Sequence, residues 1–163
     1  MAVVSFAAPV AAAGLVPDLT AKSAIVMEAS TGKILYQKDV DSLRYPASTT
    51  KIMTLLVALE NGNLDDMVTV SANAAQTEGS SLWLEPGERM KLSDLLYGMM
   101  LVSGNDATVA VAEHIAGSVD AFAKMMTAKA HEIGAVHTSF VNSSGLPDPN
   151  HYTTARDLAL IAA

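Results

Sequence analysis

Residues 46–62 read PASTTKIMTLLVALENG, and this stretch decides what kind of fold the chain can form. Apolar residues occupy nearly every position from Ile52 to Leu59, and Asn61-Gly62 supplies a stop signal. A helix that is apolar nearly all round is buried on every side, so the rest of the chain has to wrap around it. We therefore expect a central helix here, with the other elements packed against it.

Two short strand-like runs precede this helix, at 23–28 and 33–37. The residues between them, Ala29-Ser30-Thr31-Gly32, have turn character, and Gly32 is available for a positive φ, so we expect a β-hairpin. A two-stranded hairpin is rarely stable alone. We find no further strand pattern downstream.

Helical patterns dominate the rest of the chain. Ser93 is the expected N-cap of the first of them, and Asp157 stands in the capping-box position behind Thr154 in the last. The expected segments are 93–102, 106–115, 118–133 and the residues after 154. The fold class that follows is α+β, an N-terminal β-hairpin plus a mostly helical body.

Composition narrows the possible functions. A formal charge of −7 and a pI near 4.9 argue against a nucleic-acid partner, which requires clustered Lys and Arg. Hydrophobic residues make up 50% of the chain but aromatic ones only 5%, so the core is expected to be aliphatic and rich in methionine. The absence of cysteine excludes disulfides and thiolate chemistry.

The N-terminal residues differ from the rest of the chain. Residues 1–16 carry no charge, and Ala11-Ala12-Ala13 resembles a signal-peptidase site, although no basic n-region precedes it. The run is too short to span a membrane and contains Pro9 and Gly14. We expect a signal-peptide remnant or flexible tail over 1–21, export to the periplasm or the outer face of the bacterial cytoplasmic membrane, and one domain over 22–163.

The pattern Ser-x-x-Lys occurs twice, at Ser30–Lys33 and at Ser48–Lys51. The first copy lies in the hairpin turn, where Gly32 breaks any helical geometry. The second copy opens the apolar helix, which puts Ser48 and Lys51 one turn apart on the same face. Ser48 then lies at the positive end of the helix dipole, and the apolar setting lowers the pKa of Lys51. We take Ser48 as the candidate nucleophile and Lys51 as its base.

A second polar motif, Ser103-Gly104-Asn105, interrupts a Met-rich helical segment. Such a triplet is costly to bury unless it faces a cleft. Ser-x-x-Lys paired with Ser-x-Asn is the signature of penicillin-recognising serine enzymes. Over 22–163 the chain resembles the low-molecular-mass penicillin-binding proteins, the D-alanyl-D-alanine carboxypeptidases of peptidase family S11. The stretches that carry the resemblance are 29–33, 46–51, 103–107, 142–146 and 152–155.

The resemblance implies a role for each motif. Ser48 attacks the carbonyl between two D-alanines, and its backbone N–H forms half of an oxyanion hole. Lys51 takes the Ser48 proton, Ser103 relays a proton to the leaving amine, and Asn105 binds the substrate's peptide carbonyl. The segment Gly79-Ser80-Ser81 is similar to the family's cleft rim. The implied partners are peptidoglycan stem peptides and β-lactam antibiotics, with no cofactor or metal and with membrane association.

The family's third motif, Lys-Thr-Gly, does not occur in these 163 residues. We therefore expect the chain to be the N-terminal part of a longer protein, with the C-terminal strands of the sheet missing. Part of helix 52–59 and of the hairpin is then uncovered, which favours self-association through the sheet edge or the core. By itself the chain is expected to be weakly active or inactive.

Other interpretations remain open. A class A-like β-lactamase needs a deacylating glutamate, but Glu113 and Glu132, the only glutamates after Ser103, lie in helical patterns. A non-catalytic peptidoglycan-binding module of the same fold would also lack the third motif. His131 and His137 are six apart instead of the four of H-E-x-x-H, so surface histidines are favoured over a metal site. His151 is a weaker candidate for a place in the cleft.

Overall fold

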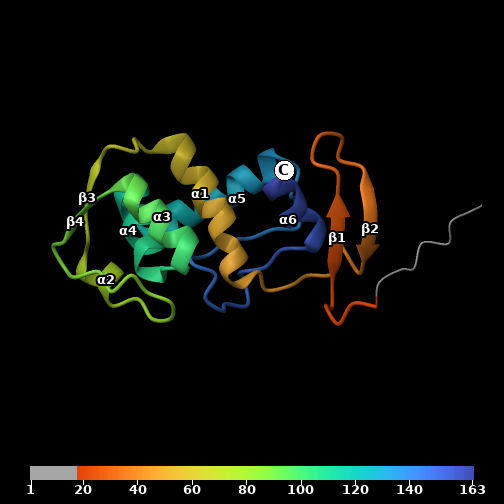
Figure 1. Cartoon of the computed structure of the whole chain (residues 1–163), viewed down its shortest axis with the longest axis horizontal. Helices are drawn as coiled ribbons and strands as arrows, with labels where there is room; N and C mark the ends of the chain where they lie inside the picture. The colour runs from red at the N-terminus through yellow and green to blue at the C-terminus, as the bar shows by residue number, and fades with distance from the viewer. Residues whose placement is uncertain (1–17) are drawn as a thin grey trace, which may run out of the picture.

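An antiparallel hairpin lies at one end of the molecule and a larger helical body beside it in the computed structural model, which describes residues 18–163 (Figure 1). The predicted α+β class is confirmed. The hairpin pairs β1, Ala24–Met27, with β2, Ile34–Lys38, and Gly32 in its turn has φ +69°. The expected signal-peptide remnant lies mostly outside the described residues.

Helix α1, Thr50–Asn61, follows a short 3-10 helix at Ala47–Thr49 and runs through the middle of the helical body. Met53, Val57 and Ala58 are fully buried on one broad face. The prediction that this helix is buried on every side is wrong, because Leu59 on the opposite face is 51% exposed. Within residues 18–163 no element covers that face, so apolar side chains remain at the surface.

Four further helices pack around α1 much as the sequence predicts: α3, Leu92–Val102; α4, Asn105–Ala116; α5, Val119–Glu132; and α6, Ala155–Ala162. The prediction of Ser93 as an N-cap is wrong. Helix α3 begins at Leu92, whose N–H donates to the carbonyl of Asp66 at 2.9 Å, and Lys91 occupies the cap position. A tertiary backbone contact therefore sets this helix start, two residues earlier than a Ser93 cap would.

At the N-terminus of α6 only one of the two hydrogen bonds of a capping box forms. The Asp157 N–H donates to Thr154 Oγ1 at 3.0 Å, as expected for an N-cap threonine. The reciprocal bond of a capping box is absent, because the Asp157 carboxylate instead accepts from the His137 N–H at 2.7 Å and from Thr138 Oγ1 at 2.8 Å. The carboxylate thus ties α6 to the segment after α5.

A second antiparallel pair of strands contradicts the prediction that no strand follows the first hairpin. Strand β3, Met67–Thr69, pairs with β4, Arg89–Lys91, and the short helix α2, Ala72–Ala75, lies between them. These strands form a separate sheet and do not extend β1–β2. Three-residue strands show too little alternation to be recognised from sequence.

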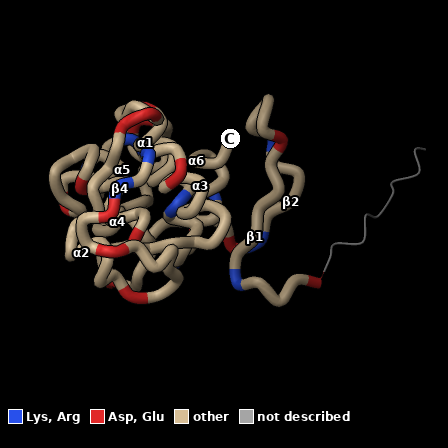
Figure 2. The backbone as a smooth tube through the Cα atoms, turned by 60° about the vertical axis from the view of Figure 1, so that its left-hand side comes forward, with Lys and Arg blue, Asp and Glu red and all other residues tan. Residues whose placement is uncertain are grey.

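The core is aliphatic and rich in methionine, as the composition indicates. Its largest fully buried side chains include Phe122, Met53, Leu92, Leu95, Met99 and Met126. In Figure 2 the acidic positions are spread around the helical body, with basic positions interspersed among them. No helix within residues 18–163 is long and apolar enough to cross a membrane.

Candidate active site

The backbone that presents Ser48 is fixed by a glycine from a distant loop. A Cβ at Gly145 would lie 1.8 Å from the carbonyl oxygen of Ala47, and Gly145 has φ +91°, so only glycine fits there. Asn142 shapes this loop, because its Oδ1 accepts from the N–H groups of Ser144 at 3.2 Å and Gly145 at 2.8 Å. The loop 142–146 therefore packs directly against the residue before Ser48.

Lys51 is the centre of the site. Its side chain is buried, and its Nζ donates to Asn105 Oδ1 at 2.8 Å, to the carbonyl of Ser144 at 2.9 Å and to Ser48 Oγ at 3.3 Å. Burial lowers the pKa of Lys51 to about 8, because the ammonium has lost its water. A lysine with that pKa is partly neutral near physiological pH and can accept a proton.

Ser103 completes a chain of hydroxyl and amine groups. Its Oγ donates to Ser48 Oγ at 2.9 Å. The residue adopts a left-handed conformation, φ +61°, where α3 ends and α4 begins, so the predicted helix break is what turns this hydroxyl towards Ser48. An open hollow of about 300 Å³ lies over these groups, lined by Ser48, Thr49, Lys51, Ile52, Met99, Met100 and Ser103.

Asn105 links α1 to the loop that was predicted as a cleft rim. Its Nδ2 donates to the carbonyl of Glu78 at 2.8 Å, and its backbone N–H donates to the carbonyl of Ser80 at 2.7 Å. A Cβ at Gly79 would lie 2.5 Å from Asn105 Nδ2. The backbone of Gly79 and Ser80 thus lies against Asn105 at the site. Ser81 Oγ instead donates to the carboxylate of Asp106 at 2.7 Å.

Asp106 is a positioning residue that sequence reasoning missed. Its buried carboxylate accepts from the N–H of Leu82 at 3.0 Å and of Leu84 at 3.1 Å, which holds the rim loop against the start of α4. Burial acts to raise the pKa of Asp106, but these backbone hydrogen bonds and the one from Ser81 outweigh it and lower the pKa. The sequence did offer one signal for this role, since Asp106 directly follows Asn105 of the Ser-x-Asn motif.

Two backbone carbonyls were also missed, those of Ser144 and Glu78. A carbonyl has no residue-type signature, so no pattern of side chains could single them out. The stretch 142–146 was noted only as part of the family resemblance, and the structure shows that this loop supplies a hydrogen-bond acceptor to Lys51.

The alternative residues lie away from this site. The carboxylate of Glu113 accepts from Ser71 Oγ and Asn73 Nδ2, and that of Glu132 pairs with Lys129. His151 does not line the hollow, because it is buried beneath α1 against Thr50. Within residues 18–163 no cluster of His, Cys, Asp and Glu could hold a metal ion.

The first Ser-x-x-Lys copy does not form a site. Ser30 lies in the turn of the hairpin, where both it and Lys33 are exposed. The prediction that helical context separates the two copies is therefore consistent with the structure.

Sequence comparison places these residues in a known family. The model of the family described as D-alanyl-D-alanine carboxypeptidase, Peptidase_S11, matches residues 10–163. The D-alanyl-D-alanine carboxypeptidase DacF of Bacillus subtilis is 47% identical over 147 residues, and the match covers 87% of this chain and 38% of the relative. The Haemophilus influenzae DacA is 40% identical over 155 residues, or 39% of its length. The chain thus spans about two fifths of the relatives it matches.

Solved structures agree with the sequence comparison. The D-alanyl-D-alanine carboxypeptidase DacD from Francisella tularensis superposes with a TM-score of 0.85 at 44% identity, covering 90% of this chain and 37% of the other. Penicillin binding protein 5 from Haemophilus influenzae gives a TM-score of 0.84 at 40% identity, covering 89% and 44%.

The lowered pKa of Lys51 predicts how stability depends on pH. Between about pH 8 and 10.5 the unfolded chain holds a proton on Lys51 that the folded chain has released. The free energy of unfolding should therefore rise with pH across this window, by about 3 kcal/mol for a shift of this size. The cost of burying Lys51 is fully present below pH 8 and is relieved above it.

Urea denaturation at several pH values would measure this effect. Lys51→Met is the matched control, because it keeps the buried chain length but cannot titrate. The difference in unfolding free energy between the two proteins should change between pH 8 and 10 and be flat below pH 7. A difference that stays constant across the whole range would show that Lys51 keeps its ordinary pKa.

Proposed function

Because the chain belongs to the D-alanyl-D-alanine carboxypeptidase family, peptidase family S11, we propose that it carries the catalytic serine, base and proton relay of such an enzyme. The substrate proposed is the peptidoglycan stem peptide that ends in D-alanyl-D-alanine. The observation that carries the proposal is the hydrogen-bonded set in which Ser48 Oγ lies within reach of both Lys51 Nζ and Ser103 Oγ.

The proposed reaction follows from this set of groups. Ser48 Oγ attacks the carbonyl carbon of the penultimate D-alanine while Lys51, in its neutral form, takes the hydroxyl proton. The proton passes by way of Ser103 to the nitrogen of the terminal D-alanine, the C–N bond breaks, and free D-alanine leaves. Water then hydrolyses the ester on Ser48, and the same groups move protons in the reverse sense.

The same acylation accounts for the proposed binding of β-lactams. Attack by Ser48 on the lactam carbonyl opens the ring, but the leaving nitrogen stays tethered to the acyl group. A lasting covalent adduct results unless a second base activates water. Glu113 and Glu132 are both held elsewhere by other side chains. This supports a penicillin-sensitive carboxypeptidase over a class A-like β-lactamase.

Intact-mass analysis after incubation with benzylpenicillin tests the proposal. The wild-type chain should gain one penicilloyl group on Ser48. The reaction should be slow for these 163 residues alone, because they contain no Lys-Thr-Gly to supply a carboxylate clamp and a second oxyanion donor. Ser48→Ala should abolish the adduct.

Ser30→Ala is the matched control, because it alters the other Ser-x-x-Lys copy and should leave the adduct unchanged. An adduct on Ser30, or no adduct on Ser48 after prolonged incubation at millimolar benzylpenicillin, would contradict the proposal. The second result would favour a non-catalytic module of the same fold.

We also propose that the protein is exported and acts at the membrane's outer face or in the periplasm. The uncharged residues 1–16 and the small-residue site Ala11-Ala12-Ala13 support this proposal. Expression in a Gram-negative host, followed by fractionation and N-terminal sequencing, would test it. A mature N-terminus just after Ala13 in the periplasmic fraction is expected, whereas an intact N-terminus found only in the cytoplasm would contradict it.

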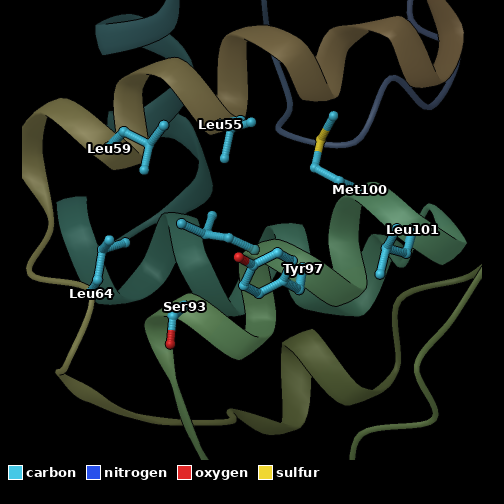
Figure 3. Close-up of a pocket in the computed structure, with 8 residues that line it drawn as sticks. Leu55, Leu59, Leu64, Ser93, Tyr97, Met100 and Leu101 are labelled. Carbon is cyan, nitrogen blue, oxygen red and sulfur yellow. The ribbon is translucent and has the colours of Figure 1, made fainter.

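Self-association of residues 1–163 is a further proposal. Leu55 and Leu59 of α1 and Tyr97 and Leu101 of α3 line an apolar groove of about 370 Å³ (Figure 3). Tyr97 is 69% exposed and Leu101 79%, so water contacts a large apolar surface there. Contact between two copies would remove this surface from water.

Sedimentation velocity over a range of concentrations measures this association. Wild-type chains should associate at tens of micromolar, and Leu101→Glu should shift them to monomer because it places a charge in the groove. Val136→Glu is the control, since Val136 is also exposed but does not line the groove. Wild-type protein that stays monomeric at 100 µM would contradict the proposal.

A further inference from the structure

His151 is a buried histidine that the proposed chemistry does not use. Its side chain is 1% exposed and lies between Phe140 and Val141 on one side and the start of α1 on the other. Its Nδ1 lies 3.2 Å from the backbone nitrogen of Val141, and its Nε2 lies 2.8 Å from Thr50 Oγ1. The ring also packs edge-on against Phe140, with centroids 5.4 Å apart.

These contacts define the tautomer of the ring. A backbone N–H can only donate, so Nδ1 must accept from Val141 and carries no proton. The ring proton is therefore on Nε2, which donates to Thr50 Oγ1. Burial lowers the pKa of His151 to about 4, against an opposing effect of Asp148, so the ring stays neutral in the range where Lys51 can act as a base.

Thr50 is the residue through which His151 can act on the site. It is the first residue of α1, lies next to Lys51 and is fully buried. The segment that bears His151 makes two further bonds to the same helix. The carbonyl of Ser144 accepts from Lys51, and that of Ser143 accepts from Thr54 Oγ1 at 2.7 Å. The segment 143–151 is thus hydrogen-bonded to α1 at three positions, Thr50, Lys51 and Thr54.

We propose that His151 is a positioning residue for Lys51. By donating to Thr50 it fixes the first turn of α1 relative to the loop 142–146, and so keeps Lys51 Nζ between Ser48 Oγ and the Ser144 carbonyl. Its effect on catalysis rests on the proposed function, whereas its effect on the position and protonation of Lys51 does not.

Two substitutions of His151 separate its two hydrogen bonds. In His151→Gln the longer amide reaches the place of Nε2, so the bond to Thr50 can form while the bond to Val141 is lost. In His151→Asn the shorter amide reaches only the place of Nδ1, so the bond to Val141 can form and Thr50 is left without its donor. Both remove the ring that packs on Phe140, so both should lower the melting temperature.

The proposal predicts different acylation rates and different pKa values of Lys51 for these two variants. His151→Asn should acylate with benzylpenicillin about tenfold more slowly than wild type, because Lys51 is no longer held in line. The pKa of Lys51, followed by NMR of its side chain, should move towards the ordinary lysine value. His151→Gln should retain most of the rate and the wild-type Lys51 titration. If both variants lose rate equally, or neither does, the contact with Thr50 does not position Lys51.

Substitutions of Thr50 test the same contact from the other side. Thr50→Val keeps the shape and removes the acceptor, so it should reproduce His151→Asn, and Thr50→Ser should restore the wild-type behaviour. His137→Gln is the matched control, because His137 is an exposed histidine of the same region. A Thr50→Val protein with the wild-type rate and Lys51 pKa would overturn the inference.

The tautomer gives a readout that does not depend on catalysis. Nitrogen-15 NMR of the wild-type chain should show His151 protonated on Nε2 and bare on Nδ1 at pH 7. A proton on Nδ1 would overturn the inference. If the wild-type chain formed no adduct at all, the proposed function would fail, while the His151 tautomer and the Lys51 titration would still decide this inference.

Discussion

The structure around the site depends on one constraint, that the protein must supply hydrogen-bond acceptors to the amine of the buried Lys51 side chain. A buried ammonium is stable only if every N–H finds an acceptor, and three acceptors surround Nζ: Ser48 Oγ, Asn105 Oδ1 and the Ser144 carbonyl. These acceptors come from three segments far apart in sequence. Holding one amine therefore requires the start of α1, the start of α4 and the loop 142–146 to meet at one point.

The unusual backbone conformations near the site follow from the close approach of these three segments. Gly145 has no side chain because Ala47 lies where a Cβ would be. Ser103 adopts a left-handed conformation because α3 must end where its hydroxyl reaches Ser48. Asp106 uses its carboxylate to hold the rim loop whose Glu78 carbonyl orients Asn105. The left-handed backbone at Gly145 and at Ser103 thus supports the same set of hydrogen bonds.

The sequence singled out Ser48, Lys51, Ser103 and Asn105, but it missed the Asp106 carboxylate and the backbone carbonyls of Ser144 and Glu78. Helical spacing separated Ser48 and Lys51 from Ser30 and Lys33, and the polar break at Ser103 marked the third hydroxyl. The carbonyl of Ser144 has no such signature, because its position depends on how a distant loop folds. The same limit hid the strands β3 and β4 and the exposed face of α1, since both depend on which neighbours pack against them.

The pH dependence of Ser48 acylation tests most directly the claim that a buried Lys51 is the base. With burial lowering the pKa of Lys51 to about 8, the second-order rate constant for acylation by benzylpenicillin should rise tenfold per pH unit well below pH 8 and level off above it. Lys51→Arg, which stays charged, should show no such rise. A rate that is flat from pH 6 to pH 9, or one that keeps rising beyond pH 10, would contradict the account.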